Sequence, residues 1–199
     1  IQALSSSALG AGHFTQQPDR DGVVRRVPML VRFEDQYYAS LSLEVVRHVM
    51  DEEMLPGFEK PLFDTRGYPG LESLKVGSAS IPVDRHVKTL VPFRGGMGSF
   101  PYVPATQVLN AVADKKILKD RIVLLGTSAP GLFDLRATPM EEAYPGVEVH
   151  ANLIAGILGG TVMEFPEYTL GAEVTMLIVV GVGMILAGTL LSPLFTTLY

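Results

Sequence analysis

The first block of polar residues with suggestive spacing is FDLRATP, near the end of the charged part of the chain. Asp134, Arg136 and Thr138 alternate there, and side chains two residues apart share one face of an extended segment. Asp134 and Arg136 can therefore form a structural ion pair, or Arg136 can bind an anion. Both interpretations are open from the residues alone.

The second block is YPGVEVHANLIAGIL, in which Glu148 and Asn152 lie one helical turn apart and His150 precedes Ile154 by one turn. No other His, Cys or acid stands at metal-ligand spacing beside His150, so we predict no metal site. The sequence has no paired carboxylates and no nucleophile–base arrangement. We therefore predict no catalytic residues and no cofactor.

Two further motifs resemble ligand loops and fail on their spacing. Gly126–Gly131 (GTSAPG) lacks the Gly-Lys-Ser/Thr ending of a phosphate loop and the second glycine of a nucleophile elbow, which favours a tight loop. Asp19-Arg20-Asp21-Gly22 begins like a calcium loop, but Leu30 stands where a bidentate Glu is required. An Asp-Gly turn before a strand is the better interpretation.

The first elements that must position these residues lie between residues 23 and 50. Val23–Phe33 is rich in β-forming residues, and Glu34–Gln36 can turn it back towards Tyr37–Ala39 as a hairpin. Ser40–Met50 then changes to helical spacing, with Ser40 as the expected N-cap. Residues 54–70 are punctuated by Pro and Gly and carry no clear pattern.

Strands and helices continue to alternate up to residue 160. We expect short strands at Leu74–Ser80 and Lys88–Phe93, and a helix over Pro104–Val112. Arg121–Leu125 (RIVLL) is continuously apolar, which is typical of a central strand covered on both faces. A last helix is expected over Val147–Leu158. The sequence therefore predicts an α/β fold, a mixed sheet with flanking helices.

The end of the chain differs sharply in composition, because Val174–Tyr199 contains no Asp, Glu, Lys or Arg. About 20 apolar residues in a helix cross the hydrocarbon core of a bilayer, and Leu170–Leu191 has that length, with Glu173 at the interface. The alternative is a buried core helix. Ser192-Pro193 predicts a turn before a second span. We divide the chain into an extracytoplasmic domain, 1–168, and a transmembrane segment, 169–199.

The charge distribution gives the span a direction. Arg136 is the last basic residue, whereas loops that remain in the cytoplasm are enriched in Lys and Arg near the membrane. The preceding domain is therefore expected outside the cytoplasm. The net charge of -5 with no basic patch predicts no nucleic-acid partner. The opening IQALSSSALGAGHF has no signal-peptide pattern, so we expect the chain to be a fragment.

The ordered blocks GHFTQQPDRDGVVRRVPMLVRF, LVPFRG, LKDRIVLLGTSAPGLFDLRATP and YPGVEVHANLIAGIL, followed by an apolar span, resemble the type 2 CHASE domain. This is the cyclase/histidine-kinase-associated sensory extracellular domain of bacterial receptors. The resemblance covers about His13 to Gly160. The chain lacks the N-terminal part of the family pattern, including a Trp-bearing segment, and contains no Trp. It is therefore expected to be an incomplete sensor domain.

The resemblance implies a sensor in the cell (inner) membrane, facing the periplasm, between an N-terminal span and a group of C-terminal spans. In such receptors a cytoplasmic adenylate or guanylate cyclase, a histidine kinase or a Ser/Thr kinase follows. The motifs YPGVEVHANLIAGIL and LSPLF of this chain are most similar to those of the cyclase-linked members. A homodimer is implied for the full-length receptor. A membrane-tethered exported enzyme and a ligand-free dimerisation module are the alternatives.

If a small-molecule or protein signal binds this domain, its expected contacts are the polar residues of the recognisable blocks. These are Arg94, Asp134, Arg136, Glu148, His150 and Asn152. Within the span, Gly183 and Ala187 have the small-xxx-small spacing that lets two helices approach closely.

Overall fold

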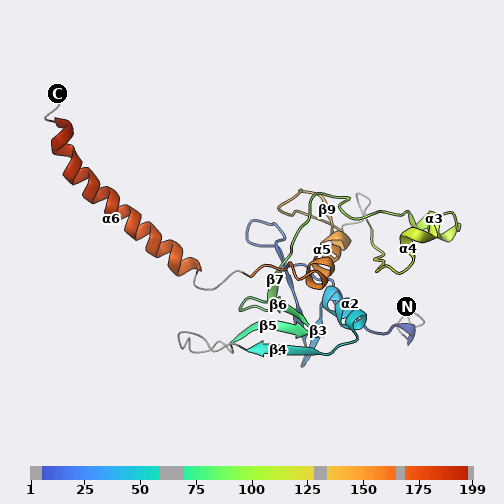
Figure 1. The fold of residues 1–199 in the computed structure, drawn as a ribbon. Helices are drawn as coiled ribbons and strands as arrows, with labels where there is room; N and C mark the ends of the chain where they lie inside the picture. The colour runs from blue at the N-terminus through green and yellow to red at the C-terminus, as the bar shows by residue number, and fades with distance from the viewer. Residues whose placement is uncertain (1–5, 59–69, 128–133, 165–168, 197–199) are drawn as a thin grey trace. The chain divides into compact units, whose positions relative to one another are not determined.

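The computed structural model describes residues 6–58, 70–127, 134–164 and 169–196, with only the backbone described at 170 and 190–196. The chain divides into two compact units, Ile1–Glu164 and Phe165–Tyr199. The first unit mixes helices with small antiparallel sheets (Figure 1), which confirms the α/β class.

The predicted hairpin is present near the start of the first unit. β2 (Leu30–Phe33) pairs antiparallel with β3 (Gln36–Ala39), in a register that sets Phe33 opposite Gln36. Glu34 takes a φ of 54° in the turn. Just before β2, β1 (Arg26–Pro28) pairs antiparallel with β7 (Lys88–Leu90). A single β-rich run therefore forms one strand pair with its immediate neighbour, β2 with β3, and one with a distant segment, β1 with β7.

The next element, α2 (Leu41–Met50), begins where the sequence predicts. The side chain of Ser40 accepts a hydrogen bond from the backbone N–H of Leu43, which satisfies one free donor of the first turn. The helix ends at Asp51, whose backbone is left-handed with a φ of 52°. Leu43 and Val46 are buried, so this helix contributes one apolar face to the core.

A three-stranded antiparallel sheet follows, formed by β4 (Met54–Phe58), β5 (Leu71–Val76) and β6 (Ala79–Pro82) in the order β4-β5-β6. Residue patterns predict no strand at β4, because Pro56 and Gly57 interrupt the segment. An edge strand tolerates proline, which cannot donate to a ladder. The strand predicted over Leu74–Ser80 is divided between β5 and β6 by a turn at Gly77.

The prediction of a central strand at Arg121–Leu125 is wrong. The segment forms no strand, and Val123 and Leu125 are 60% and 88% exposed. A central strand needs neighbours along both edges, and no described strand pairs with this run. The sheets instead form from strands close in sequence or from β1 with β7.

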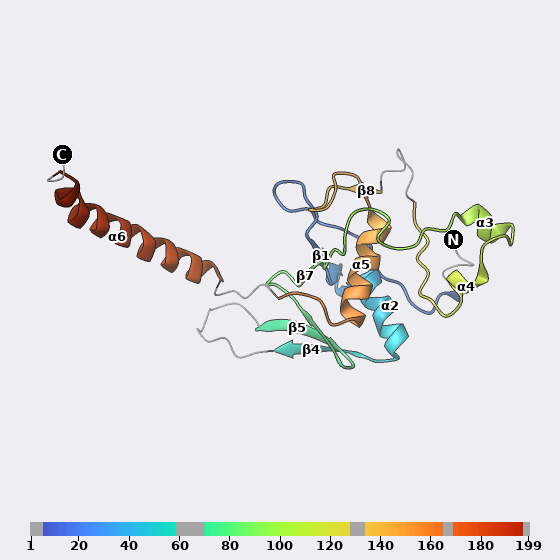
Figure 2. The same ribbon diagram turned by 45° about the horizontal axis from the view of Figure 1, so that its top comes forward.

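The helix predicted over Pro104–Val112 is present in shortened form as α3 (Ala105–Leu109), and α4 (Lys115–Leu118) follows it. Neither helix has a buried residue. Figures 1 and 2 show both helices away from the sheets. Most apolar side chains of residues 104–125 are exposed, whereas Leu124 packs against the core.

The last elements of the first unit are β8 (Leu135–Arg136), β9 (Tyr144–Pro145) and α5 (Gly146–Leu158). The predicted helix is confirmed, and it lies beside α2 in both views (Figures 1 and 2). The core that α5 shares with α2 and the sheets comprises Val24, Val27, Met29, Leu43, Val46, Leu74, Val76, Ile81, Val91, Tyr144, Val149, Leu153, Ile154 and Ile157.

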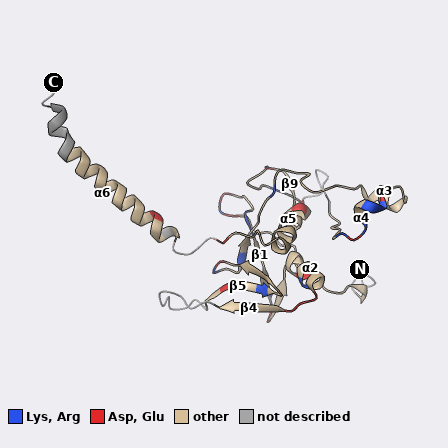
Figure 3. Ribbon diagram, viewed as in Figure 1, with Lys and Arg blue, Asp and Glu red and all other residues tan. Residues whose placement is uncertain are grey.

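The second unit contains one long helix, α6 (Thr169–Thr196). Its segment Gly171–Thr189 is long and apolar enough to cross a membrane, and Figure 3 shows it almost free of charge. The turn predicted at Ser192-Pro193 is wrong, because the helix continues through both residues. Strongly apolar helices tolerate an internal proline where other groups satisfy the freed backbone.

Candidate functional site

Three of the predicted site residues lie on α5, and all three are buried. Glu148 and His150 are each 2% exposed, and Asn152 is fully enclosed. Residues four apart on a helix share a face, whereas residues two apart do not. Glu148 and Asn152 therefore belong to one side of α5 and His150 to the other, so the helix separates two polar clusters.

The Glu148 carboxylate holds a loop that comes from a distant part of the chain. It accepts hydrogen bonds from the backbone N–H of Gly98 (3.2 Å), from that of Phe100 (3.4 Å) and from the Tyr102 hydroxyl (2.7 Å). Glu148 also lies in the first turn of α5, where the helix dipole favours a negative charge. Three donors and the helix end make this buried charge tolerable.

Asn152 uses its whole amide to join three segments. Its Oδ1 accepts from the backbone N–H of Arg94 at 3.0 Å, and its Nδ2 donates to the Tyr144 hydroxyl and to the Glu148 carbonyl, both at 2.8 Å. Both donor hydrogens of the amide are thereby occupied. The guanidinium of Arg94 lies over the Phe100 ring, 5.4 Å from its centroid. Arg94 thus contributes its backbone to the cluster and its side chain to an aromatic contact.

The two tyrosines of this cluster stay protonated over an extended pH range. Burial, followed by the hydrogen bond to Glu148, raises the pKa of Tyr102 well above its ordinary value. Burial is also the main reason that the pKa of Tyr144 is raised, with the nearby Glu148 charge adding to the effect. Both hydroxyls therefore keep their protons and act as hydrogen-bonding groups.

On the other side of α5, His150 meets the start of α2. Its Nδ1 lies 2.8 Å from the Ser42 hydroxyl, and both side chains are buried. Burial lowers the pKa of His150, and the charge of His13 lowers it further, whereas the Phe14 carbonyl and Asp134 act in the opposite sense. The Nε2 atom makes no hydrogen bond of good geometry to the described residues. The imidazole is thus held neutral between two segments.

The N-terminal segment supplies the rest of this second cluster. His13 pairs with the entry to α2, because its N–H donates to the Ala39 carbonyl (2.9 Å) and its carbonyl accepts from the Leu41 N–H (2.7 Å). Both ring nitrogens of His13 are buried without a described hydrogen-bond partner, and burial lowers the pKa of the ring. Gln16 Nε2 donates to the Gly146 carbonyl at 3.0 Å.

Asp134 and Arg136 form the ion pair that their spacing predicts. The Arg136 Nη2 atom lies 3.9 Å from Asp134 Oδ1, and both side chains are more than a quarter exposed, so the pair contributes little to stability. Asp134 matters more through its backbone, whose carbonyl accepts from the Gly146 N–H at 2.8 Å. A Cβ on Gly146 would collide with the Asp134 carboxylate, so a larger residue at the start of α5 would displace the Asp134 side chain.

The predicted site residues therefore fall into three groups rather than one pocket: Arg94 with Glu148 and Asn152, His150 alone on the opposite face, and Asp134 with Arg136. Their roles in ligand binding stay predictions. Sequence reasoning did not select five residues that complete these clusters, which are His13, Gln16, Ser42, Tyr102 and Tyr144. No local pattern points to them: Gln16, Ser42 and Tyr102 bond to residues 46 to 130 positions away, and even Tyr144 bonds to Asn152 two helical turns further on.

The Asp19–Gly22 motif is the turn that the sequence predicts. Gly22 has a φ of 82°, and its N–H donates to the Asp19 carbonyl at 2.9 Å. Asp19 and Asp21 both pair with Arg25. The motif at Gly126–Gly131 lies largely outside the described residues. Within the described part of the chain, no group of three His, Cys, Asp or Glu side chains is placed to hold a metal ion.

The chain thus combines an α/β unit that contains buried polar clusters with one helix long and apolar enough to span a membrane. The model of the CHASE2 domain matches residues 2–189 of the 199-residue chain. The chain therefore belongs to the CHASE2 family, whose members are extracellular sensory domains and not catalytic ones. Comparison with curated proteins and with solved structures gave no match.

Proposed function

We propose that this chain is the signal-input part of a bacterial transmembrane receptor and that it controls a cytoplasmic adenylate or guanylate cyclase. One observation carries the proposal: the family match runs from residue 2 to residue 189 and so includes the whole apolar segment Gly171–Thr189. The sensory domain and the span thus belong to one module. A module of this kind can transmit a conformational change from the sensory domain through the span to the cytoplasmic side of the membrane.

The relay is a shift between two states of the receptor. A signal can shift such an equilibrium only through its different affinity for the two states, and the coupling between the outer domain and the output domain is reciprocal. We propose that the contacts of six polar residues differ between the two states. These residues are Arg94, Asp134, Arg136, Glu148, His150 and Asn152. Their hydrogen bonds and ion pairs would then change when the signal shifts the receptor from one state to the other.

The cyclase assignment is tested with the full-length gene product in membrane vesicles. Conversion of ATP to cyclic AMP, or of GTP to cyclic GMP, supports it. Autophosphorylation from labelled ATP without cyclic nucleotide would instead identify the kinase-linked alternative. The absence of both activities would favour a ligand-free dimerisation module or a membrane-tethered exported enzyme. That result would overturn the receptor proposal.

The proposed topology places the first unit in the periplasm and α6 in the inner membrane. Because the chain contains no cysteine, a single introduced thiol reports its own position. Ser78→Cys, in the exposed turn between β5 and β6, should react in intact spheroplasts with a thiol reagent that does not cross membranes. Labelling only after lysis would show that the unit lies in the cytoplasm.

A further inference from the structure

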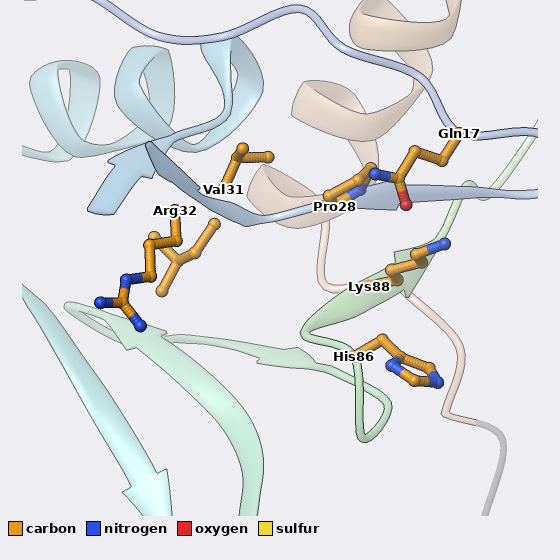
Figure 4. A pocket seen from close by; sticks show the side chains of 7 residues that line it. Gln17, Pro28, Val31, Arg32, His86 and Lys88 are labelled. Atoms are coloured by element: carbon orange, nitrogen blue, oxygen red, sulfur yellow. The ribbon is translucent and has the colours of Figure 1, made fainter. Parts of the chain in front are cut away.

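A pocket of about 360 Å³ lies between the β1–β2 segment and the turn that leads into β7 (Figure 4). Its size falls at the lower end of the range of small-molecule sites. The lining side chains are Gln17, Pro28, Leu30, Val31, Arg32, His86 and Lys88. None of these residues has been assigned a role above, and the pocket is separate from the clusters on α5.

The lining of the pocket is basic, although the chain as a whole carries a net charge of -5. Arg32 is engaged at the rim, where its Nη2 pairs with the Asp35 carboxylate at 3.0 Å. Lys88 differs, because no carboxylate of the described residues lies within ion-pair distance of its ammonium group. The pocket therefore contains a positive charge that its own walls do not neutralise.

The nearest acid on the same turn is already occupied. Asp84 Oδ1 accepts hydrogen bonds from the backbone N–H groups of His86 (2.8 Å) and Lys88 (3.0 Å). Its other oxygen faces Arg26, at 3.9 Å. Asp84 thus fixes the backbone that carries His86 and Lys88 and leaves the Lys88 side chain available.

The backbone between these two residues is strained. Val87 has a φ of 56°, which is a rare conformation for a β-branched residue. It is held by its N–H to the Asp84 carbonyl and by its own carbonyl to the Met29 N–H, both at 2.8 Å. Strain of this kind persists only where the surroundings impose it, and it concentrates at binding sites.

Polar and apolar groups occupy different parts of the pocket. Figure 4 shows the side chains of Lys88 and His86 extending to the same side, while the Gln17 amide turns back towards Pro28 and Arg32 points away. Pro28 stands opposite Lys88 in the β1–β7 register, and with Leu30 and Val31 it supplies apolar surface. An ammonium, an amide and an imidazole beside an apolar wall suit a carboxylate group that carries a short hydrocarbon chain.

We propose that this pocket binds a small organic carboxylate, with Lys88 as the charge partner, His86 and Gln17 as hydrogen-bond donors, and Pro28, Leu30 and Val31 in contact with the hydrocarbon. Binding at this site does not require the receptor function. The use of such a carboxylate as the sensed signal does rest on that proposed function.

Hexanoate is a suitable probe, and the 199-residue chain in detergent micelles is the protein to test. Titration followed by isothermal calorimetry should show saturable binding of hexanoate that weakens with added salt, because partly exposed charges are screened. Lys88→Gln should lower the affinity at least tenfold. Lys75→Gln makes the same change on the exposed part of β5 and should leave the affinity within a factor of two.

Three outcomes overturn the proposal: no saturable binding of hexanoate, equal weakening by Lys88→Gln and Lys75→Gln, or equal affinity for inorganic phosphate. The last would show that charge alone is recognised and that the apolar wall has no role. Circular dichroism of both variants establishes that they are folded. If hexanoate binds as described but leaves the output of the full-length receptor unchanged, the carboxylate is not the sensed signal, while the binding site stands and the receptor function is decided separately by the cyclase assay.

Discussion

The Tyr102 hydroxyl donates a 2.7 Å hydrogen bond to the Glu148 carboxylate across 46 residues of sequence. Together with the N–H groups of Gly98 and Phe100, it surrounds a charge that is 2% exposed. Every one of these partners is a donor. The loop from Gly98 to Tyr102 is thus attached to the first turn of α5 by a carboxylate that accepts all three bonds.

Replacement of Glu148 by Gln should therefore destabilise the first unit even though the size of the side chain is unchanged. The amide N–H₂ would face donors, which leaves buried groups unpaired and costs about 3 kcal/mol. Tyr102→Phe removes one donor and should cost about 1.5 kcal/mol. Urea unfolding followed by circular dichroism measures both.

The exposed Glu142 offers a matched control, since Glu142→Gln makes the same chemical change on the surface. It should alter the free energy of unfolding by less than about 0.5 kcal/mol. Equal effects of Glu142→Gln and Glu148→Gln would show that the carboxylate of Glu148 does not anchor the loop.

The neutral histidines on the opposite side of α5 predict a loss of stability in mild acid. The pKa values of His150 and His13 are lowered from 6.5 by burial, so the unfolded chain binds protons first as the pH falls. Stability is therefore full above about pH 6.5 and decreases between that value and the folded-state pKa values. Each proton contributes a slope of up to about 1.4 kcal/mol per pH unit.

Unfolding free energies measured from pH 7.5 to pH 5 test this linkage. His150→Gln keeps a polar group near Ser42 and should flatten the profile. Asp134→Asn removes a charge that favours protonated His150, so it should lower the folded-state pKa further and extend the decline to lower pH. A profile that His150→Gln does not change would exclude His150 as the titrating group.

A further prediction concerns the end of α2, where Asp51 has a left-handed backbone. That conformation costs an L-residue about 1 kcal/mol relative to glycine, and an acid at a helix C-terminus opposes the helix dipole. Asp51→Gly should therefore stabilise the first unit by about 1 kcal/mol, because relief of both terms exceeds the extra freedom of glycine in the unfolded chain. Asp51→Asn should give about half of this gain, since it removes only the charge. A loss of stability in Asp51→Gly, measured by the urea midpoint, would contradict the prediction.

Sequence patterns predict the structure correctly where the stabilising contacts join residues that are close in the sequence. Ser40 is an N-cap because its hydroxyl reaches an N–H three residues on, and Asp134 pairs with Arg136 across two residues. The candidate site depends instead on long-range contacts, such as Ser42 with His150 over 108 residues, which periodicity cannot reveal. Arg121–Leu125 shows the converse error, because its apolar run satisfies the pattern of a buried strand without a described strand to pair with.

The last prediction concerns α6 and the homodimer proposed for the receptor. A Cβ at Gly183 or at Gly181 meets nothing within 4 Å in the single chain, so a leucine at either position leaves the helix itself undisturbed. Gly183 and Ala187 share one face, whereas Gly181 lies on the opposite side. Gly183→Leu should therefore block close helix approach and weaken dimerisation about tenfold, equivalent to about 1.4 kcal/mol. Gly181→Leu adds the same volume and should have little effect. Energy transfer between labelled full-length receptors in vesicles measures the dimer fraction, and equal effects of the two variants would remove Gly183 and Ala187 from the interface.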